Sequence, residues 1–177
     1  MKITISGMPG SGKSTLARAL AEKLKLKHYS MGKFHRDMAR QRNMSELEFN
    51  ELAAKDLDIH KEIDQQQIRL KNEDNFVLDS RLGFHFIPDS IKIFLKINIE
   101  TGAERIMQHP RKGELYKSEE EAVKAIKKRI DLEKQTYKTL YQVDHYNLER
   151  YDFVLDTTHL AVEKATQKTL DFLKSFK

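Results

Sequence analysis

Cysteine is absent from the sequence, and proline and glycine are scarce, with three and seven residues among 177. Without cysteine the chain can form neither disulfide bonds nor thiolate metal sites, and it has no thiol nucleophile. No linker, internal repeat or low-complexity tract divides the chain, which favours a single domain. No apolar run approaches the roughly 20 residues that cross a bilayer. We therefore expect no membrane-spanning helix and no membrane partner.

Residues 1–7 carry one basic side chain and then alternate between polar and apolar residues, where a signal peptide would place a continuous apolar stretch. We therefore expect a cytoplasmic protein. Hydrophobic residues make up 39% of the chain and charged residues 33%, a balance that describes a globular protein with a heavily charged surface. A chain of 177 residues is long enough to bury one substantial core.

The net charge of +5 permits polyanionic partners such as nucleotides, nucleic acid or a membrane surface. Acidic residues are interspersed through the same segments, so the excess charge favours a solvated lysine-rich surface. There is no basic stripe interleaved with aromatic residues, and we expect no nucleic-acid partner. The histidines lack the spacing of a zinc site; they are His28, His35, His60, His85, His109, His145 and His159.

Short apolar runs alternate with segments of helical periodicity along the whole chain. The runs that predict strands are 3–6, 27–30, 76–79, 91–97 and 151–155. The segments that predict helices are 14–26, 32–42, 45–53, 58–72, 100–108, 118–141 and 162–176. Ser45 and Glu48 have the spacing of a capping box. This alternation predicts an α/β fold with a mostly parallel sheet covered by helices on both faces.

Residues 7–14, Gly-Met-Pro-Gly-Ser-Gly-Lys-Ser, match the full G-x-x-x-x-G-K-[ST] pattern between a predicted strand and a predicted helix. The glycines let the backbone curl around an anion, and the helix that follows adds its positive N-terminal end. Lys13 should reach the terminal phosphates of a nucleotide, and the Ser14 hydroxyl should coordinate Mg²⁺. The pattern predicts a site for ATP.

Such a loop leaves kinase, hydrolase and switch open, so other residues must choose among them. Asp79 ends an apolar strand, where it would meet the loop at the carboxyl edge of the sheet and could support Mg²⁺. Arg81 follows two residues later, and Arg36 lies on the helix after Gly32. Both could project over the same edge, where cations position an acceptor phosphate and neutralise the reacting oxygens. This arrangement favours a kinase.

Four blocks of the sequence together resemble the cytidylate kinases, especially those of the short archaeal type. The blocks are residues 7–15, 30–36, 77–82 and 151–158. The resemblance implies transfer of the γ-phosphate of ATP to CMP or dCMP with Mg²⁺, on a three-layer P-loop fold with a five-stranded parallel sheet. We expect the protein to be a monomer. It implies a core of residues 1–30, 75–107 and 142–177, a monophosphate-binding segment at about 31–72, and a lid at about 108–137.

The resemblance also implies roles for individual residues. Arg36 and Arg81 would bind the acceptor phosphate, and Asp64 would face the acceptor base. Arg129 would join Lys13 and Arg81 at the transferring group. The residues expected to hold ATP are Gly7, Gly10, Ser11, Gly12, Lys13, Ser14, Thr15 and Arg105, and those expected to support the metal are Ser14 and Asp79. Asp131, two residues after Arg129, matches the family's Arg-x-Asp pattern and would orient the lid.

The chain departs from the family pattern at three positions. Thr136 and His109 stand where relatives usually or often carry lid arginines, and Ser80 replaces a usual glycine. The missing cations leave the rate and the acceptor open, because each can matter by orders of magnitude. One alternative is a kinase of the same scaffold acting on AMP or another small metabolite. Others are an ATP-dependent nucleic-acid-binding or RNA-end-processing protein, and a nucleotide-dependent switch or chaperone.

Overall fold

The computed structural model describes residues 1–44, 46–53, 56–110 and 115–176. The strands are β1 (Lys2–Gly7), β2 (Lys27–Ser30), β3 (Phe76–Asp79), β4 (Ile91–Lys96) and β5 (Phe153–Asp156). The helices are α1 (Lys13–Leu24), α2 (Met31–Gln41), α3 (Glu46–Ala53), α4 (Leu57–Leu70), α5 (Gly83–Phe86), α6 (Ile99–Gln108), α7 (Glu119–Tyr141) and α8 (Val162–Lys174). A short 3₁₀ helix, η1 (Leu148–Arg150), precedes β5.

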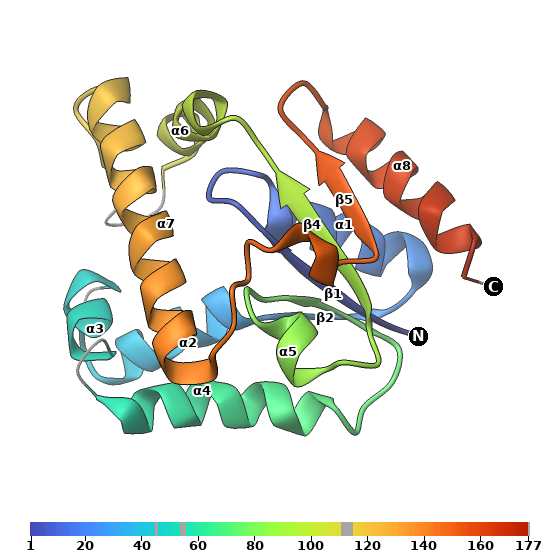
Figure 1. Ribbon diagram of the computed structural model, residues 1–177, viewed down its shortest axis with the longest axis horizontal. Helices are drawn as coiled ribbons and strands as arrows, with labels where there is room; N and C mark the ends of the chain where they lie inside the picture. The colour runs from blue at the N-terminus through green and yellow to red at the C-terminus, as the bar shows by residue number, and fades with distance from the viewer. Residues whose placement is uncertain (45, 54–55, 111–114, 177) are drawn as a thin grey trace.

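The five strands form one parallel sheet in the order β2-β3-β1-β4-β5. The central strand β1 pairs with β3 on one side and β4 on the other, with Ile5 opposite Asp79 and Gly7 opposite Leu95. The carboxyl ends of β1 and β3 therefore meet at one edge, where ligands bind in open α/β sheets. The predicted parallel α/β fold is confirmed (Figure 1).

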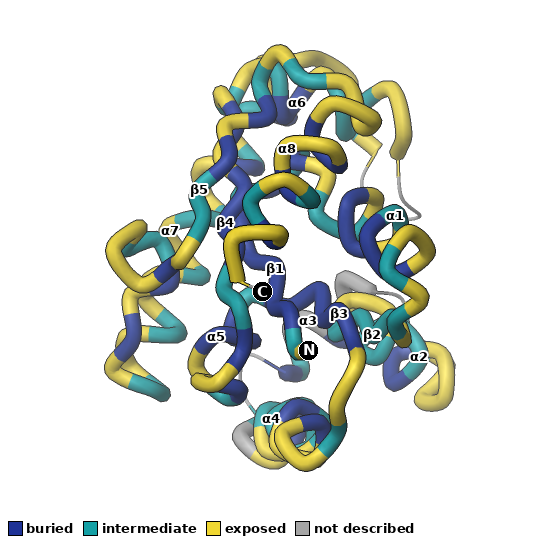
Figure 2. The backbone as a smooth tube through the Cα atoms, turned by 90° about the vertical axis from the view of Figure 1, so that its right-hand side faces the viewer, coloured by how far each residue is buried: buried dark blue, intermediate teal, exposed yellow. Residues whose placement is uncertain are grey.

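Side chains along the strands alternate between the two faces, which gives the sheet two separate hydrophobic layers. On the first face, Ile3, Ile5 and Leu95 pack against α1 and α8 in the largest core cluster. Figure 2 draws β1 mostly in the dark blue of buried residues, and the buried residues of β4 are Ile93, Phe94 and Leu95, as expected of parallel strands covered on both sides.

Aromatic residues dominate the second face. Phe94 packs with Phe84 of α5 and with Tyr151, and the partly buried Tyr137 and Tyr141 of α7 join this cluster. This contact fixes the C-terminal half of α7 against the core. Figure 1 shows α7 running from that contact towards α6.

Two smaller clusters hold the segments that flank the sheet. Met38 of α2 packs with Phe49 of α3 and Ile59 of α4, which joins the three helices of the predicted monophosphate-binding segment. Ala122 and Ile126 of α7 pack on α6 in the region predicted as a lid. The N-terminal half of α7 therefore packs on α6, apart from the two hydrophobic layers of the sheet.

The structure differs from the expected elements at several boundaries. Helix α5 and the turn η1 were not predicted, because each is too short to show periodicity. Strand β5 begins at Phe153 and not at Tyr151, whose hydroxyl donates to the His145 carbonyl oxygen at 2.7 Å. The capping box predicted at Ser45 lies outside the described residues. Within the described ranges, no helix is both long and apolar enough to cross a membrane.

Candidate active site

A cleft of about 1100 Å³ lies at the carboxyl edge of the sheet. The loop between β1 and α1 forms its floor, and α2, α4, α6 and α7 contribute to its walls. Among the lining residues are Gly10, Ser11, Gly12, Lys13, Ser14, Thr15, Arg36, Asp64, Asp79, Arg81, Arg105 and Arg129. The structure therefore brings the sequence-predicted residues to one cavity, apart from Gly7, the last residue of β1, and Asp131 on α7.

The glycines of the loop are required by close backbone approaches. Gly7 has φ of +146°, and a Cβ there would lie 2.4 Å from the Leu95 carbonyl oxygen of β4. Gly10 has φ of +77°, and its Cβ would lie 2.4 Å from the carbonyl oxygen of Gly102 in α6. Larger residues would collide with main-chain atoms that cannot move aside, so the loop conformation depends on glycine at both positions.

Lys13, at the start of α1, folds back over the loop. Its ammonium group donates to the carbonyl oxygens of Gly7 at 2.8 Å and Met8 at 3.0 Å. Burial, reinforced by the nearby Arg81, lowers the pKa of Lys13 to about 7. In this state the Lys13 ammonium group uses two of its hydrogen-bond donors on these carbonyl oxygens. A bound phosphate would attract the same group.

Ser14 and Asp79 form the second feature of the floor. The Ser14 hydroxyl donates to Asp79 Oδ2, which also accepts from the Ser30 hydroxyl at 3.2 Å. Hydroxyl and carboxylate oxygens are ligands that suit Mg²⁺. The two residues predicted to support the metal therefore lie in contact and fit that ion. Among the residues the structure describes, no group of three or more acidic or histidine side chains could hold a metal alone.

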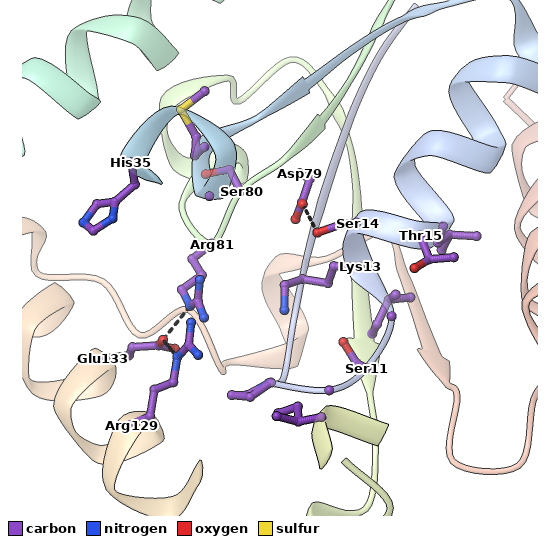
Figure 3. Close-up of a pocket in the computed structure, with 18 of the residues that line it drawn as sticks. Ser11, Lys13, Ser14, Thr15, His35, Asp79, Ser80, Arg81, Arg129 and Glu133 are labelled. Atoms are coloured by element: carbon purple, nitrogen blue, oxygen red, sulfur yellow. Dashed lines mark hydrogen bonds and ion pairs between the residues drawn. The ribbon is translucent and has the colours of Figure 1, made fainter. Parts of the chain in front are cut away.

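Across the cleft from Lys13, one carboxylate contacts two arginines (Figure 3). Glu133 Oε1 lies 2.7 Å from Arg81 Nε and 3.0 Å from Arg129 Nε. Glu133 and Arg129 are one turn apart on α7, whereas Arg81 comes from the segment after β3. Glu133 thus connects the core to the helix of the predicted lid.

The other oxygen of this carboxylate faces two aromatic residues from the segment after α7. The Tyr146 hydroxyl donates to Glu133 Oε2 at 3.2 Å, and Nε2 of the fully buried His145 lies 3.6 Å from the same oxygen. Burial would raise the pKa of Glu133, but Arg81 and its other partners hold it well below the ordinary value. Glu133 is therefore a charged, nearly enclosed group.

The wall beside α4 contains polar pairs that suit a small polar ligand. The Tyr141 hydroxyl donates to Asp64 Oδ2 at 2.8 Å, and burial raises the pKa of Asp64 although this bond opposes the shift. The Ser80 hydroxyl donates to Gln67 Oε1. Ser80 is buried, and Gln67 satisfies its hydroxyl.

Arg105 lines the cleft near the loop between β5 and α8. One terminal nitrogen donates to the carbonyl oxygens of Thr157 at 2.9 Å and Thr158 at 3.2 Å, with a longer bond to Leu160 at 3.3 Å. Thr157 in turn donates through its hydroxyl to the Ser11 carbonyl oxygen at 3.1 Å. Arg105 therefore fixes a loop that contacts the phosphate loop, a role that the sequence did not indicate.

Other residues were placed less completely by the sequence. Thr136 and His109, at the positions where the resemblance implies lid arginines, both line the cleft, whereas Asp131 is exposed on α7 and is not among the lining residues. Sequence reasoning missed Glu133 and Tyr141. The only available signal for Glu133 was its spacing of four residues from Arg129, which is common on solvated helices.

The parallel sheet, the glycine-rich loop after β1 and Lys13 at the start of α1 together define the P-loop α/β fold. A shikimate kinase from Bacteroides thetaiotaomicron has the same fold, with a TM-score of 0.70, 14% sequence identity and 98% of each chain covered. At this identity the likeness concerns the fold alone.

Sequence comparison places the chain more narrowly. The model of the cytidylate kinase-like family matches residues 2–159, and the chain belongs to this family. Relatives include the cytidylate kinase of Methanopyrus kandleri, which is 40% identical over 88% of this chain and 84% of the relative. The cytidylate kinase of Sulfolobus acidocaldarius is 36% identical over 92% of this chain and 88% of the relative.

Proposed function

We propose that the chain is an ATP-dependent kinase that transfers the γ-phosphate of ATP to CMP or dCMP. The observation that carries the proposal is the convergence of Lys13, Arg81 and Arg129 on one cleft with the polar wall around Asp64. Cytidylate kinases from two archaea that resemble the chain along most of its length support the choice of acceptor.

The transfer forms a bond between an oxygen of the acceptor phosphate and the γ-phosphorus, and it breaks the bond from that phosphorus to the bridging oxygen of ADP. No covalent intermediate with the protein is needed, so catalysis rests on positioning and on stabilising charge. Lys13 would bind the β- and γ-phosphates from the loop. Arg81 and Arg129 would approach the transferring group from the opposite wall.

Ser14 and Asp79 would hold Mg²⁺, Ser14 directly and Asp79 directly or through water. The metal supplies neutralisation of phosphate charge and alignment of the β- and γ-oxygens. Since one carboxylate and one hydroxyl are too few ligands, phosphate oxygens and water would complete the coordination. Until that ion binds, the hydrogen bond from Ser14 to Asp79 keeps the two ligands adjacent.

The acceptor would bind between α2 and α4. Arg36 and Arg81 would bind its phosphate, and Asp64 would accept from the exocyclic amino group of cytosine. A carboxylate held in place by the Tyr141 hydroxyl disfavours uracil, which presents a carbonyl oxygen at that position. All of these groups come from one chain, so the proposal requires only a monomer, and its substrates are cytoplasmic metabolites.

Purified protein with Mg-ATP should be offered CMP, dCMP, UMP, AMP, GMP and several metabolite alcohols in parallel, with an acceptor-free reaction to measure ATP hydrolysis. We expect CMP and dCMP to give the highest kcat/KM. A preference for AMP or for an alcohol would contradict the proposed acceptor. Turnover that depends on RNA would favour the nucleic-acid alternative instead.

A further inference from the structure

The Glu133 cluster joins parts of the cleft that come from distant parts of the chain. It consists of Glu133 with Arg81, Arg129, His145 and Tyr146. The side chain of Glu133 is 13% exposed and that of Arg81 22%. A carboxylate this enclosed is costly unless cations and donors compensate it, and here the two arginines and the Tyr146 hydroxyl do so.

The contacts use a particular edge of each arginine. Both ion pairs run from Nε to the same oxygen, Oε1. A guanidinium has a second edge formed by its two terminal nitrogens, and that edge can bind a phosphate while Nε is engaged elsewhere. Contact with Glu133 is therefore compatible with simultaneous contact between the arginines and the phosphates.

Electrostatic repulsion among the cations of the cleft is a second reason why a carboxylate is needed at position 133. Lys13, Arg81 and Arg129 interact electrostatically, since both arginines contribute to lowering the pKa of Lys13 while Glu133 raises it. Three cations facing one cleft repel each other when no phosphate is present. The negative charge of Glu133 offsets part of that repulsion and keeps the arginines at the cleft.

We propose that Glu133 is a positioning residue that acts through Arg81 and Arg129, holding their guanidinium groups towards the phosphates during transfer. The inference deepens the proposed function and rests on it. Tyr146 fixes the other carboxylate oxygen, so the Glu133 side chain is itself held in one orientation. A residue of this kind changes the rate of transfer more than the binding of substrates.

Glu133→Gln tests this role, because the side chain keeps its shape and loses its charge. With Mg-ATP and CMP we expect kcat to fall about 10- to 100-fold, the size of effect that small misplacements of catalytic groups cause, with both KM values nearly unchanged. The matched control is Glu120→Gln on the same helix, which removes an exposed carboxylate paired with Lys124 and should leave kcat unaltered.

A double variant separates positioning from a general structural role. If Glu133 acts through Arg129, the loss in Glu133→Gln/Arg129→Ala should be clearly smaller than the product of the two single losses. Losses that multiply in full, or a Glu133→Gln enzyme with the parent kcat, would overturn the inference. If the Gln variant does not fold, Glu133→Asp keeps the charge and withdraws the carboxylate by one methylene. Parent kcat in that variant would overturn it equally.

The parent enzyme distinguishes this failure from failure of the proposed function. A parent that phosphorylates another acceptor overturns the choice of CMP, and the same variants are then compared with that acceptor. A parent that transfers phosphate to no acceptor overturns the proposed function and the inference together. An active parent that Glu133→Gln matches in kcat overturns the inference alone.

Discussion

The floor of the cleft and the wall opposite Lys13 are built in opposite ways. On the floor, the phosphate loop is one continuous segment in which backbone carbonyl oxygens hold the Lys13 ammonium group. On the opposite wall, the Glu133 cluster draws on the segment after β3, on α7 and on the segment that follows α7. The floor is formed by neighbouring residues of the chain and held by main-chain hydrogen bonds. The opposite wall is assembled by the tertiary structure and held by ion pairs.

This difference predicts how the floor and the opposite wall respond to substitutions. Carbonyl dipoles that contact Lys13 move little because the glycines fix the loop against β4 and α6. The arginines of the other wall have long side chains, and their direction depends on the carboxylate between them. We expect substitutions on the floor to remove function and substitutions on the opposite wall to reduce it by degrees.

The largest effect is expected for Lys13→Met. Removing the cation beside the β- and γ-phosphates should lower kcat by at least about 10²–10³-fold, as the loss of a preorganised charge-stabilising group does. Circular dichroism should show an intact fold. Lys23→Met is the control, since Lys23 is exposed in the last turn of the same helix. A folded Lys13→Met variant with parent turnover would show that the loop is not the site of transfer.

Arg129→Ala is expected to have the next largest effect, a reduction of kcat on the order of a hundredfold. The lid predicted at residues 108–137 should also gain protection from amide hydrogen exchange when ATP and acceptor bind together, because a kinase must exclude water from the γ-phosphate. Lys124→Ala, on the exposed face of α7, is the control for Arg129→Ala and should keep the parent kcat.

Equal exchange in both states, together with normal turnover of Arg129→Ala, would leave α7 as an ordinary charged helix. The structure sharpens the expectation within the segment. Residues near Tyr137 pack on the aromatic core, whereas the N-terminal half of α7 is held mainly through Ala122 and Ile126. The gain in protection should therefore be greater in the N-terminal half.

The sequence predicted the floor of the cleft well for a physical reason. The residues of the phosphate loop are neighbours in the chain, and the glycines, Lys13 and Ser14 have roles that follow from their spacing alone. Asp79 was also predictable, because it ends a strand beside β1. The five strands and the parallel topology followed from apolar runs alternating with helices.

The opposite wall could not be read in the same way. Glu133 lies on a helix rich in Lys and Glu, and the sequence shows its neighbour Arg129 but not Arg81, which approaches only in the folded chain. The bond between Ser80 and Gln67 likewise joins the segment after β3 to α4 across a turn of unpredicted geometry. Contacts that depend on where helices pack are not encoded in local spacing.

The smallest effect concerns the charge of Lys13 in the protein without nucleotide. Because burial lowers its pKa to about 7, the protonated lysine destabilises the folded state fully below pH 7. As the pH rises from about 7 towards the ordinary value of 10.5, the folded protein loses this proton before the unfolded chain does, and the destabilisation disappears.

The difference in Tm between Lys13→Met and the parent should therefore fall as the pH rises from 7 to 10. We expect a change of several degrees, since 1 kcal/mol moves the Tm of a domain this size by about 2–4 °C. Lys23→Met should show no such trend, and a Tm difference for Lys13→Met that stays constant with pH would mean that backbone carbonyl oxygens alone keep Lys13 fully charged.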